Sequence, residues 1–306
     1  CRQPNGRAWN LVKGEGGQEM AHKKRIRIST GERIFYIVNY FFLTLLGIST
    51  LYPFVNTIAN SLSSSRAILT GEVVLLPVEW TVEAYRQITT QGRIFHSMAN
   101  TVYLTLIGTF LNMLVTTMCA YPLSKRYFPG KMLFVTLIAI TMFFGGGMIP
   151  TFILIRTIGL MDKYGALWLL SLFSTGNMII LRTFFQQLPA ELEESAKIDG
   201  ANDITVLVRI YLPLSKAVLA TLTLFYAVGW WNSYMGPLLY ISDPDKTVLM
   251  LKLKQLLEEV GVVKQIVAPE SFKAASIIVS TVPILCVYPF LQKYFVKGVM
   301  VGSIKG

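Results

Sequence analysis

Long apolar runs alternate with short polar segments along this chain. Six runs lack Asp, Glu, Lys, Arg and His and are near or above the length needed to cross a bilayer: 34–65, 97–124, 132–155, 164–181, 217–242 and 274–292. A helix rises about 1.5 Å per residue, so roughly 20 residues cross a hydrocarbon core about 30 Å thick. Because unpaired backbone groups are costly in lipid, the pattern predicts six membrane-spanning helices.

The expected helices have bounds set by the polar residues and prolines around them. They lie near 34–58, 97–123, 132–155, 164–187, 217–241 and 274–292. Two connecting segments, 59–96 and 242–273, each contain a short amphipathic stretch, TVEAYRQI and VLMLKLKQLLEEV. Apolar residues at helical spacing predict a short surface helix in each.

The third run contains the sequence FFGGGMIP. Its three consecutive glycines, Gly145, Gly146 and Gly147, and its proline, Pro150, weaken a regular helix. We therefore expect a kink or an unwound turn. Two interpretations are open: a hinge in a pathway that opens alternately, or a close helix crossing that only small residues permit.

A polar segment, 188–213, separates the fourth run from the fifth. It predicts a helix over about 190–199, which Gly200 is well placed to end in the left-handed conformation. Asn202 or Asp203 can cap a second short helix. At about 100° per residue, the first helix has one small face of Leu192, Ser195, Ala196 and Asp199 and another face of Glu191, Glu194 and Ile198. The small face allows close approach by a partner, and an ordinary acidic loop is the alternative.

Composition agrees with a membrane protein, because 53% of the 306 residues are hydrophobic and only 15% are charged. The net charge of +11 needs no nucleic acid, since basic loops beside anionic lipid account for it. An even number of spans puts both termini on one side. If that side is cytoplasmic, Lys and Arg are in excess there, chiefly before the first span and after the second.

The expected organisation is a cytoplasmic arm, 1–33, a six-helix domain, 34–297, with 188–213 as a cytoplasmic loop, and a cytoplasmic tail, 298–306. Residues 13–20 can be encoded by a ribosome-binding sequence placed just before a start codon. Met20 is therefore expected to be the first native residue, with 1–19 not native. A lipoprotein beginning at an acylated Cys1 is the less favoured alternative.

The sequence lacks the residues that ion coupling, catalysis, metal binding and ATP binding would need. Spans without ionisable groups disfavour an ion-coupled transporter. The two histidines, His22 and His96, lie outside the spans and lack a catalytic partner, which disfavours an intramembrane enzyme. The cysteines show no metal or disulfide spacing, and no metal site is expected. No G-x-x-x-x-G-K-[ST] phosphate loop occurs, so no cofactor is expected on this chain and any ATP binds another subunit.

An aromatic stripe marks the fifth run. Tyr226, Trp230 and Tyr234 recur every four residues, with Trp231 and Asn232 beside them. Aromatic faces that stack on sugar C–H groups, with an amide to hold a hydroxyl, suit a neutral glycan. Trp230 lies roughly 21 Å along the helix from Lys216, too deep for an interfacial belt. Packing between helices is the remaining alternative for Trp230.

The polar segment also carries a recognisable spacing. Glu194-Ser195-Ala196, three residues, Gly200, nine residues and Ile210-x-Leu212-Pro213 resemble the EAA loop of ABC importer permeases, with Ser195 in place of the usual central alanine. The stretches FGGGMIPTFILIRTIGL, WWNSYMGPLLYI and QKYFVKGVMVGSIKG are similar to those of the carbohydrate-importer group. Within that group, the chain most resembles the lipoprotein-partnered polysaccharide and oligosaccharide permeases.

The resemblance implies an all-α integral membrane protein with the ABC importer type I permease fold in a bacterial cytoplasmic membrane. It implies a second homologous permease, two cytosolic ATPases that bind ATP and Mg, an extracytoplasmic solute-binding protein and a carbohydrate substrate. The residues implied in coupling to the ATPase are Leu192, Glu194, Ser195, Ala196, Asp199 and Gly200. Such a subunit catalyses no covalent reaction. The rival interpretation is a membrane-embedded enzyme or assembly factor that docks a cytosolic partner through 188–213.

Overall fold

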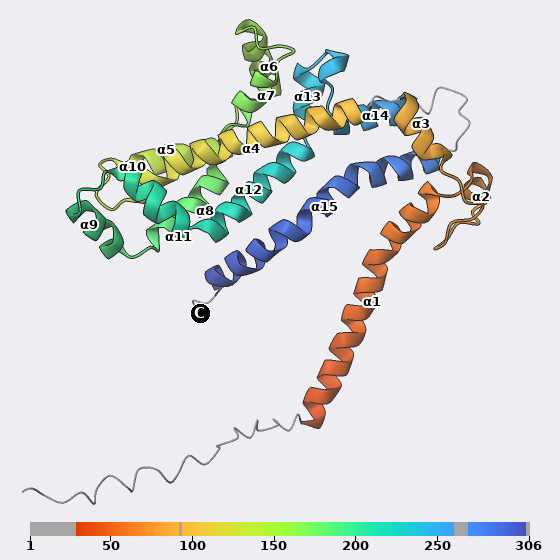
Figure 1. Cartoon of the computed structure of the whole chain (residues 1–306), viewed down its shortest axis with the longest axis horizontal. Coiled ribbons are helices and arrows are strands. Elements are labelled where there is room, and N and C mark those ends of the chain that lie inside the picture. The colour runs from red at the N-terminus through yellow and green to blue at the C-terminus, as the bar shows by residue number, and fades with distance from the viewer. Residues whose placement is uncertain (1–28, 92–93, 260–268, 304–306) are drawn as a thin grey trace, which may run out of the picture. The chain divides into compact units, whose positions relative to one another are not determined.

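The computed structural model describes residues 29–91, 94–259 and 269–303, and every regular element in these ranges is a helix (Figure 1). The all-α prediction is confirmed. The chain divides into two units, Cys1–Tyr52 and Pro53–Gly306, which are described separately. The proposed extra residues 1–19 lie outside the described part.

The first unit contributes most of one long helix, α1 (Thr30–Ser61). The Glu32 carboxylate accepts a 2.8 Å hydrogen bond from the Ser29 backbone N–H, which satisfies one free donor at the start of the helix. Large apolar side chains such as Phe35, Leu46 and Leu51 are more than half exposed. The helix is long and apolar enough to cross a membrane, as the first run predicts.

In the second unit, α4 (Ile94–Ser124) is the central helix. It packs against α12 (Lys216–Trp231) and α8 (Thr175–Gln186), and α12 packs in turn against α15 (Pro269–Ser303) (Figure 1). Buried residues recur along one stripe of α4 at spacings of three and four: Ser97, Thr101, Leu104, Gly108, Asn112 and Thr116. The other sides of α4 carry exposed apolar residues, which suits a helix with one face in a bundle and one in lipid.

The remaining elements of the second unit are short. They are α2 (Ser65–Leu69), α3 (Glu83–Gln91), α5 (Lys131–Phe143), α6 (Met148–Thr157), α7 (Tyr164–Leu170), α9 (Ala190–Ile198), α10 (Asp203–Val206), the π-helical turn η1 (Leu207–Tyr211), α11 (Leu212–Leu214), α13 (Met235–Tyr240), the 3-10 turn η2 (Pro244–Lys246) and α14 (Leu249–Glu259). The two predicted surface helices are confirmed as α3 and α14. Ile88, Leu249 and Phe272 join both of them to the start of α15 in one buried cluster.

The expectation of continuous helices over 164–187 and 217–241 is wrong, because α7 and α8 meet at 54° and α12 ends at Trp231, before α13. The run 132–155 is broken where its glycines predict it, and α5 and α6 meet there at 108°. A further bend of 85° joins the segment Asp203–Leu214 to the start of α12. With α1 and α4, the described helices offer up to five spans. The sixth predicted run, 274–292, lies within α15, which is helical to Ser303, and the total of six stays a prediction.

Two of the interruptions coincide with features that the pattern of apolar residues does not show. The Ser171 carbonyl, just after α7, accepts a hydrogen bond from the Asn112 side chain, and the Ser174 hydroxyl caps α8. α12 ends at Trp231 because Pro237 lacks an N–H group and its ring would clash with a helical carbonyl at Ser233. The predicted fifth helix therefore stops well short of residue 241.

The break at the glycine run is confirmed. α5 ends at Phe143 and α6 begins at Met148, and Gly147 has φ +82°, a conformation that side chains rarely adopt. A Cβ atom added to Gly145 or Gly146 would have no heavy atom within 4 Å. Within the described chain, these two glycines therefore do not serve a close helix crossing. The hinge interpretation stays a prediction.

Candidate functional site

The segment 188–213 folds as two short capped helices and a π-helical turn. Gly200 ends α9 with φ +82°, and the Ala201 N–H donates to the Ala196 carbonyl at 2.9 Å, the hydrogen bond of a Schellman motif. The Asn202 side chain caps α10 by accepting a 2.8 Å hydrogen bond from the Thr205 N–H. Both local predictions, the glycine cap and the second capped helix, are confirmed.

The faces of α9 differ in part from the expected grouping. Glu193 is only 8% exposed, and Ala196 packs at the edge of a buried cluster that includes Met178 and Phe185. The other residues implied in coupling are exposed: Leu192, Glu194, Ser195, Asp199 and Gly200. Ala196 therefore does not share an outer face with them. Ile198, 86% exposed, adds a large apolar group to the outer surface.

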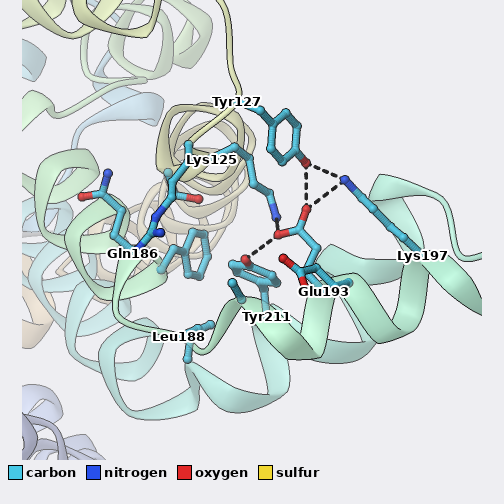
Figure 2. Close-up of a pocket in the computed structure, with 12 residues that line it drawn as sticks. Lys125, Tyr127, Gln186, Leu188, Glu193, Lys197 and Tyr211 are labelled. Carbon is cyan, nitrogen blue, oxygen red and sulfur yellow. Dashed lines mark hydrogen bonds and ion pairs between the residues drawn. The ribbon is translucent and has the colours of Figure 1, made fainter.

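Glu193 is the centre of a hydrogen-bonded network (Figure 2). Its Oε2 accepts from Lys125 Nζ at 2.5 Å and from the Tyr211 hydroxyl at 2.9 Å. Its Oε1 accepts from the Tyr127 hydroxyl at 2.7 Å and lies 3.0 Å from Lys197 Nζ. Lys197 also donates to the Tyr127 oxygen at 2.7 Å, which closes a ring of contacts. One carboxylate thus joins three separate segments of the chain.

The network determines which groups are charged. Burial opposes ionisation of Glu193, but hydrogen bonds from Lys125, Tyr127, Lys197 and Tyr211 outweigh it and lower the pKa of Glu193 to about 2. Burial lowers the pKa of Lys125, and its bond to Glu193 opposes that shift. Bonds to Tyr127 and Glu193 raise the pKa of Lys197 above its ordinary value. At neutral pH the site holds one buried anion between two cations.

Lys125 is held by aromatic rings as well as by charge. Its Nζ lies 4.0 Å from the ring centres of both Tyr121 and Tyr211, a cation–π geometry. The two rings are themselves edge-to-face, with centres 5.1 Å apart. A cavity of about 570 Å³ lies beside these groups, lined by residues from the end of α4, the end of α8 and α9. The ion pair is thus built into a polar hollow at one end of the bundle.

Sequence reasoning did not single out Glu193, Lys125, Tyr127 or Tyr211. Lys125 and Tyr127 lie in the basic turn after the second run, more than 60 positions before Glu193. A partial signal was the pair Glu193-Glu194, because adjacent residues on a helix point about 100° apart and the two carboxylates therefore meet different surroundings.

The structure places the first two residues of the aromatic stripe between helices. Tyr226 and Trp230 are 8% and 6% exposed. The Trp230 Nε1 donates to Asn112 Oδ1 at 2.6 Å, and the Tyr226 hydroxyl lies 2.7 Å from the Thr116 hydroxyl oxygen. These contacts join α12 to α4, which is the packing alternative raised for Trp230.

The other three stripe residues lie at or beyond the end of α12. Trp231 is half-buried and its Nε1 donates to the Ser280 carbonyl at 3.3 Å. Asn232 is exposed, and its amide donates to the Val228 carbonyl at 2.9 Å. Tyr234 follows the helix end and packs beside the cluster that contains Trp230. Contact of the stripe with a substrate stays a prediction.

The apolar helices, the broken spans and the capped loop 188–213 agree with the permease fold that the sequence leads us to expect. The chain matches the family described as binding-protein-dependent transport system inner membrane component over residues 32–301, and it belongs to that family. It is therefore the permease subunit of an ABC transporter and not an enzyme. Membership implies a bacterial inner-membrane complex with ATPase and binding-protein partners.

Particular relatives agree over nearly the whole chain. Protein LplC of Bacillus subtilis (strain 168) is 42% identical over 282 residues, which cover 90% of this chain and 96% of LplC. The polygalacturonan/rhamnogalacturonan transport system permease protein YtcP of the same strain is 40% identical over 285 residues, covering 90% and 99%. In the crystal structure of a bacterial ABC transporter involved in the import of the acidic polysaccharide alginate, one chain is 34% identical with a TM-score of 0.82, covering 87% and 98%.

Proposed function

We propose that this chain is the permease subunit of an ATP-driven importer that carries oligosaccharides across the bacterial cytoplasmic membrane. The proposal rests on two proteins that this chain matches over most of its length and that are both named for carbohydrate transport. YtcP and the alginate transporter are both named for polysaccharides, at 40% and 34% identity. The substrate proposed first is therefore a fragment of a polysaccharide that contains uronic acids.

Energy would enter through the outer surface of α9. The exposed Glu194, Ser195, Asp199 and Gly200 would meet a cytosolic ATPase, which would hold ATP and Mg. Ile198 and Ile204, 86% and 73% exposed, add apolar area to this surface. Exposed apolar groups beside polar ones are typical of a docking surface, which supports this assignment.

Alternating access would use the break between α5 and α6. No residue of α5 is buried within this chain. Phe143, Phe144 and Ile149, at the break, are 80%, 77% and 73% exposed. A second homologous permease or lipid would cover these side chains, and Gly145, Gly146 and Gly147 with Pro150 would provide the hinge.

The absence of charged residues from the apolar runs limits how this chain could bind an acidic glycan. The apolar runs contain no basic residue that could pair with a uronate carboxylate. Trp231, Asn232 and Tyr234, which are less buried, would contact sugar rings and hydroxyls. Tyr226 and Trp230 are bonded to α4 and would reach a sugar only if α4 and α12 separated.

The test is uptake by the complete complex with its binding protein in proteoliposomes. Oligogalacturonates, rhamnogalacturonan fragments, alginate oligomers and neutral maltodextrins are each supplied with the binding protein on the side opposite the ATPases, and ATP is enclosed on the ATPase side. We expect saturable accumulation of at least one oligosaccharide, with no accumulation when a non-hydrolysable ATP analogue replaces ATP. Uptake that continues without ATP but needs an ion gradient would contradict the proposal, as would failure of all four groups to stimulate hydrolysis.

A further inference from the structure

We infer that the buried Glu193 is the positioning residue that ties the movement of α9 to both α4 and α12. The inference rests on the proposed function, since it assumes that an ATPase moves α9. It assigns force transmission to a carboxylate adjacent to the exposed Glu194. The exposed residues would meet the partner, and Glu193 would convey the displacement inward.

α9 has few other ties to the bundle. Its backbone lies close to no other helix along more than a few residues in the described parts of the chain. Ala196 is only partly buried, and the remaining residues of α9 other than Glu193 are exposed. A short helix held in this way would swing on its flanking turns if its one buried side chain were released.

The first branch of the network runs to α4. Lys125 follows Ser124, the last residue of α4, and is 5% exposed. The same helix end is held by Arg182 of α8, whose Nε donates to the Leu123 carbonyl at 3.0 Å. Cations near the last carbonyls of a helix are favourable. Displacement of Glu193 therefore pulls on a fixed helix end.

The second branch runs to α12. Tyr211 closes the π-helical turn η1, and its ring packs edge-to-face on Phe185 with centres 5.4 Å apart. The Tyr211 carbonyl accepts a 3.0 Å hydrogen bond from the Ser215 N–H, directly before α12 begins at Lys216. A pull on the Tyr211 hydroxyl is thus passed to the first turn of α12.

The two branches meet again deeper in the bundle. Trp230 on α12 is bonded to Asn112 on α4, and Tyr226 is bonded to Thr116. Because α4 and α12 are joined at this second level, a pull at Glu193 moves them as one body. Removing one partner of a buried ion pair is costly, so the link resists being opened under load.

The test uses Glu193→Gln, Lys125→Met and the double variant in the intact complex. Glu193→Gln leaves Lys125 without its anion, and Lys125→Met leaves Glu193 with Lys197 as its remaining cation. The double variant removes the buried charge pair and should recover folding. Glu72→Gln, which removes an exposed carboxylate outside α9, is the charge-matched control. Each complex is assayed for melting temperature, bound ATPase, ATP hydrolysis and oligogalacturonate or maltodextrin uptake.

We expect the double variant to regain assembly and hydrolysis while uptake per ATP falls about tenfold, within the usual range of coupling between sites. Glu72→Gln should match the wild type. A merely structural role for the pair predicts that uptake per ATP recovers together with folding in the double variant. That recovery would overturn the inference.

A distance measurement tests the link without any glycan. Spin labels at Glu191→Cys on α9 and Met118→Cys on α4, both exposed positions, are introduced after the three native cysteines are replaced by serine. The label separation should be the same in the nucleotide-free and vanadate-trapped states, but should change between them in the double variant. An unchanged separation in the double variant would refute the link. Failure of the wild type to import any glycan would count against the proposed function alone.

Discussion

Gly108 of α4 packs directly against the Trp230 ring of α12, and Gly108→Ala probes this contact. A Cβ atom on Gly108 would lie 2.4 Å from Trp230 Cε2 and 2.5 Å from its Nε1, where ordinary contacts begin at 3.4 Å. The indole cannot turn aside easily, because its Nε1 is bonded to Asn112 and its rim is buried. The two helices must therefore separate by about 1 Å at this level.

The expected cost follows from two terms. Overpacking of a buried contact costs about 1 to 3 kcal/mol. Loss or lengthening of the bond between Trp230 and Asn112 adds about 1 kcal/mol. Gly108→Ala should therefore lower the free energy of unfolding by roughly 2 to 4 kcal/mol. Gly229→Ala is the control, since its added Cβ would have no heavy atom within 4 Å and alanine favours a helix.

The measurement is thermal unfolding of the purified complex, followed by circular dichroism. We expect a lower melting temperature for Gly108→Ala, and an unchanged or slightly higher one for Gly229→Ala. Adding Trp230→Leu to Gly108→Ala makes room for the methyl group and should recover part of the loss. Suppose that Gly108→Ala has the melting temperature of the wild type, or that adding Trp230→Leu to Gly108→Ala does not raise the melting temperature. Either result would show that Gly108 and Trp230 do not pack as closely as described.

Three further predictions concern the loop and the aromatic stripe. Because the pKa of Glu193 is lowered from an ordinary 4.5 to about 2, its stabilisation is fully present above pH 4.5 and is lost as the pH falls toward 2. The difference in melting temperature between wild type and Glu193→Gln should therefore be constant above pH 4.5 and should shrink as the pH falls below 4.5. An undiminished difference at pH 2 contradicts this. Gly200→Val forces a β-branched residue to φ +82°, which costs about 1 to 3 kcal/mol locally and should uncouple hydrolysis from uptake; full coupling would count against the role of the turn. Replacing Trp230 and Trp231 by Ala should impair uptake while the ATPase still binds, and unchanged uptake kinetics would remove both from the substrate path.

Much of the fold could be predicted because lipid excludes charge. The uncharged runs locate α1 and α4 within a few residues. The break at Gly145 to Gly147 was predictable, since three glycines in succession weaken a helix by composition alone. The interruption at Ser171 was not, because it depends on Asn112, a residue 59 positions away. A hydropathy pattern carries no information about such a partner.

The same distinction separates the parts of the site. The Gly200 and Asn202 caps follow from rules that act within a few residues, and both were predicted. Glu193 was missed because what distinguishes it from Glu194 is burial against Lys125 and Tyr127, and these come from another loop. Local sequence determines how α9 begins and ends, whereas tertiary packing decides which of its carboxylates faces inward.

The Glu193 network also sets an order of events during biosynthesis. Lys125 is synthesised 68 residues before Glu193, and Tyr211 is synthesised 18 residues after it. Until Glu193 emerges, the end of α4 carries a cation with no anion to pair with, so this end stays hydrated. The polar hollow can close only after the segment leading into α12 has been made. Docking of α9 therefore follows the synthesis of α4, α5 and α8, and can precede that of α12.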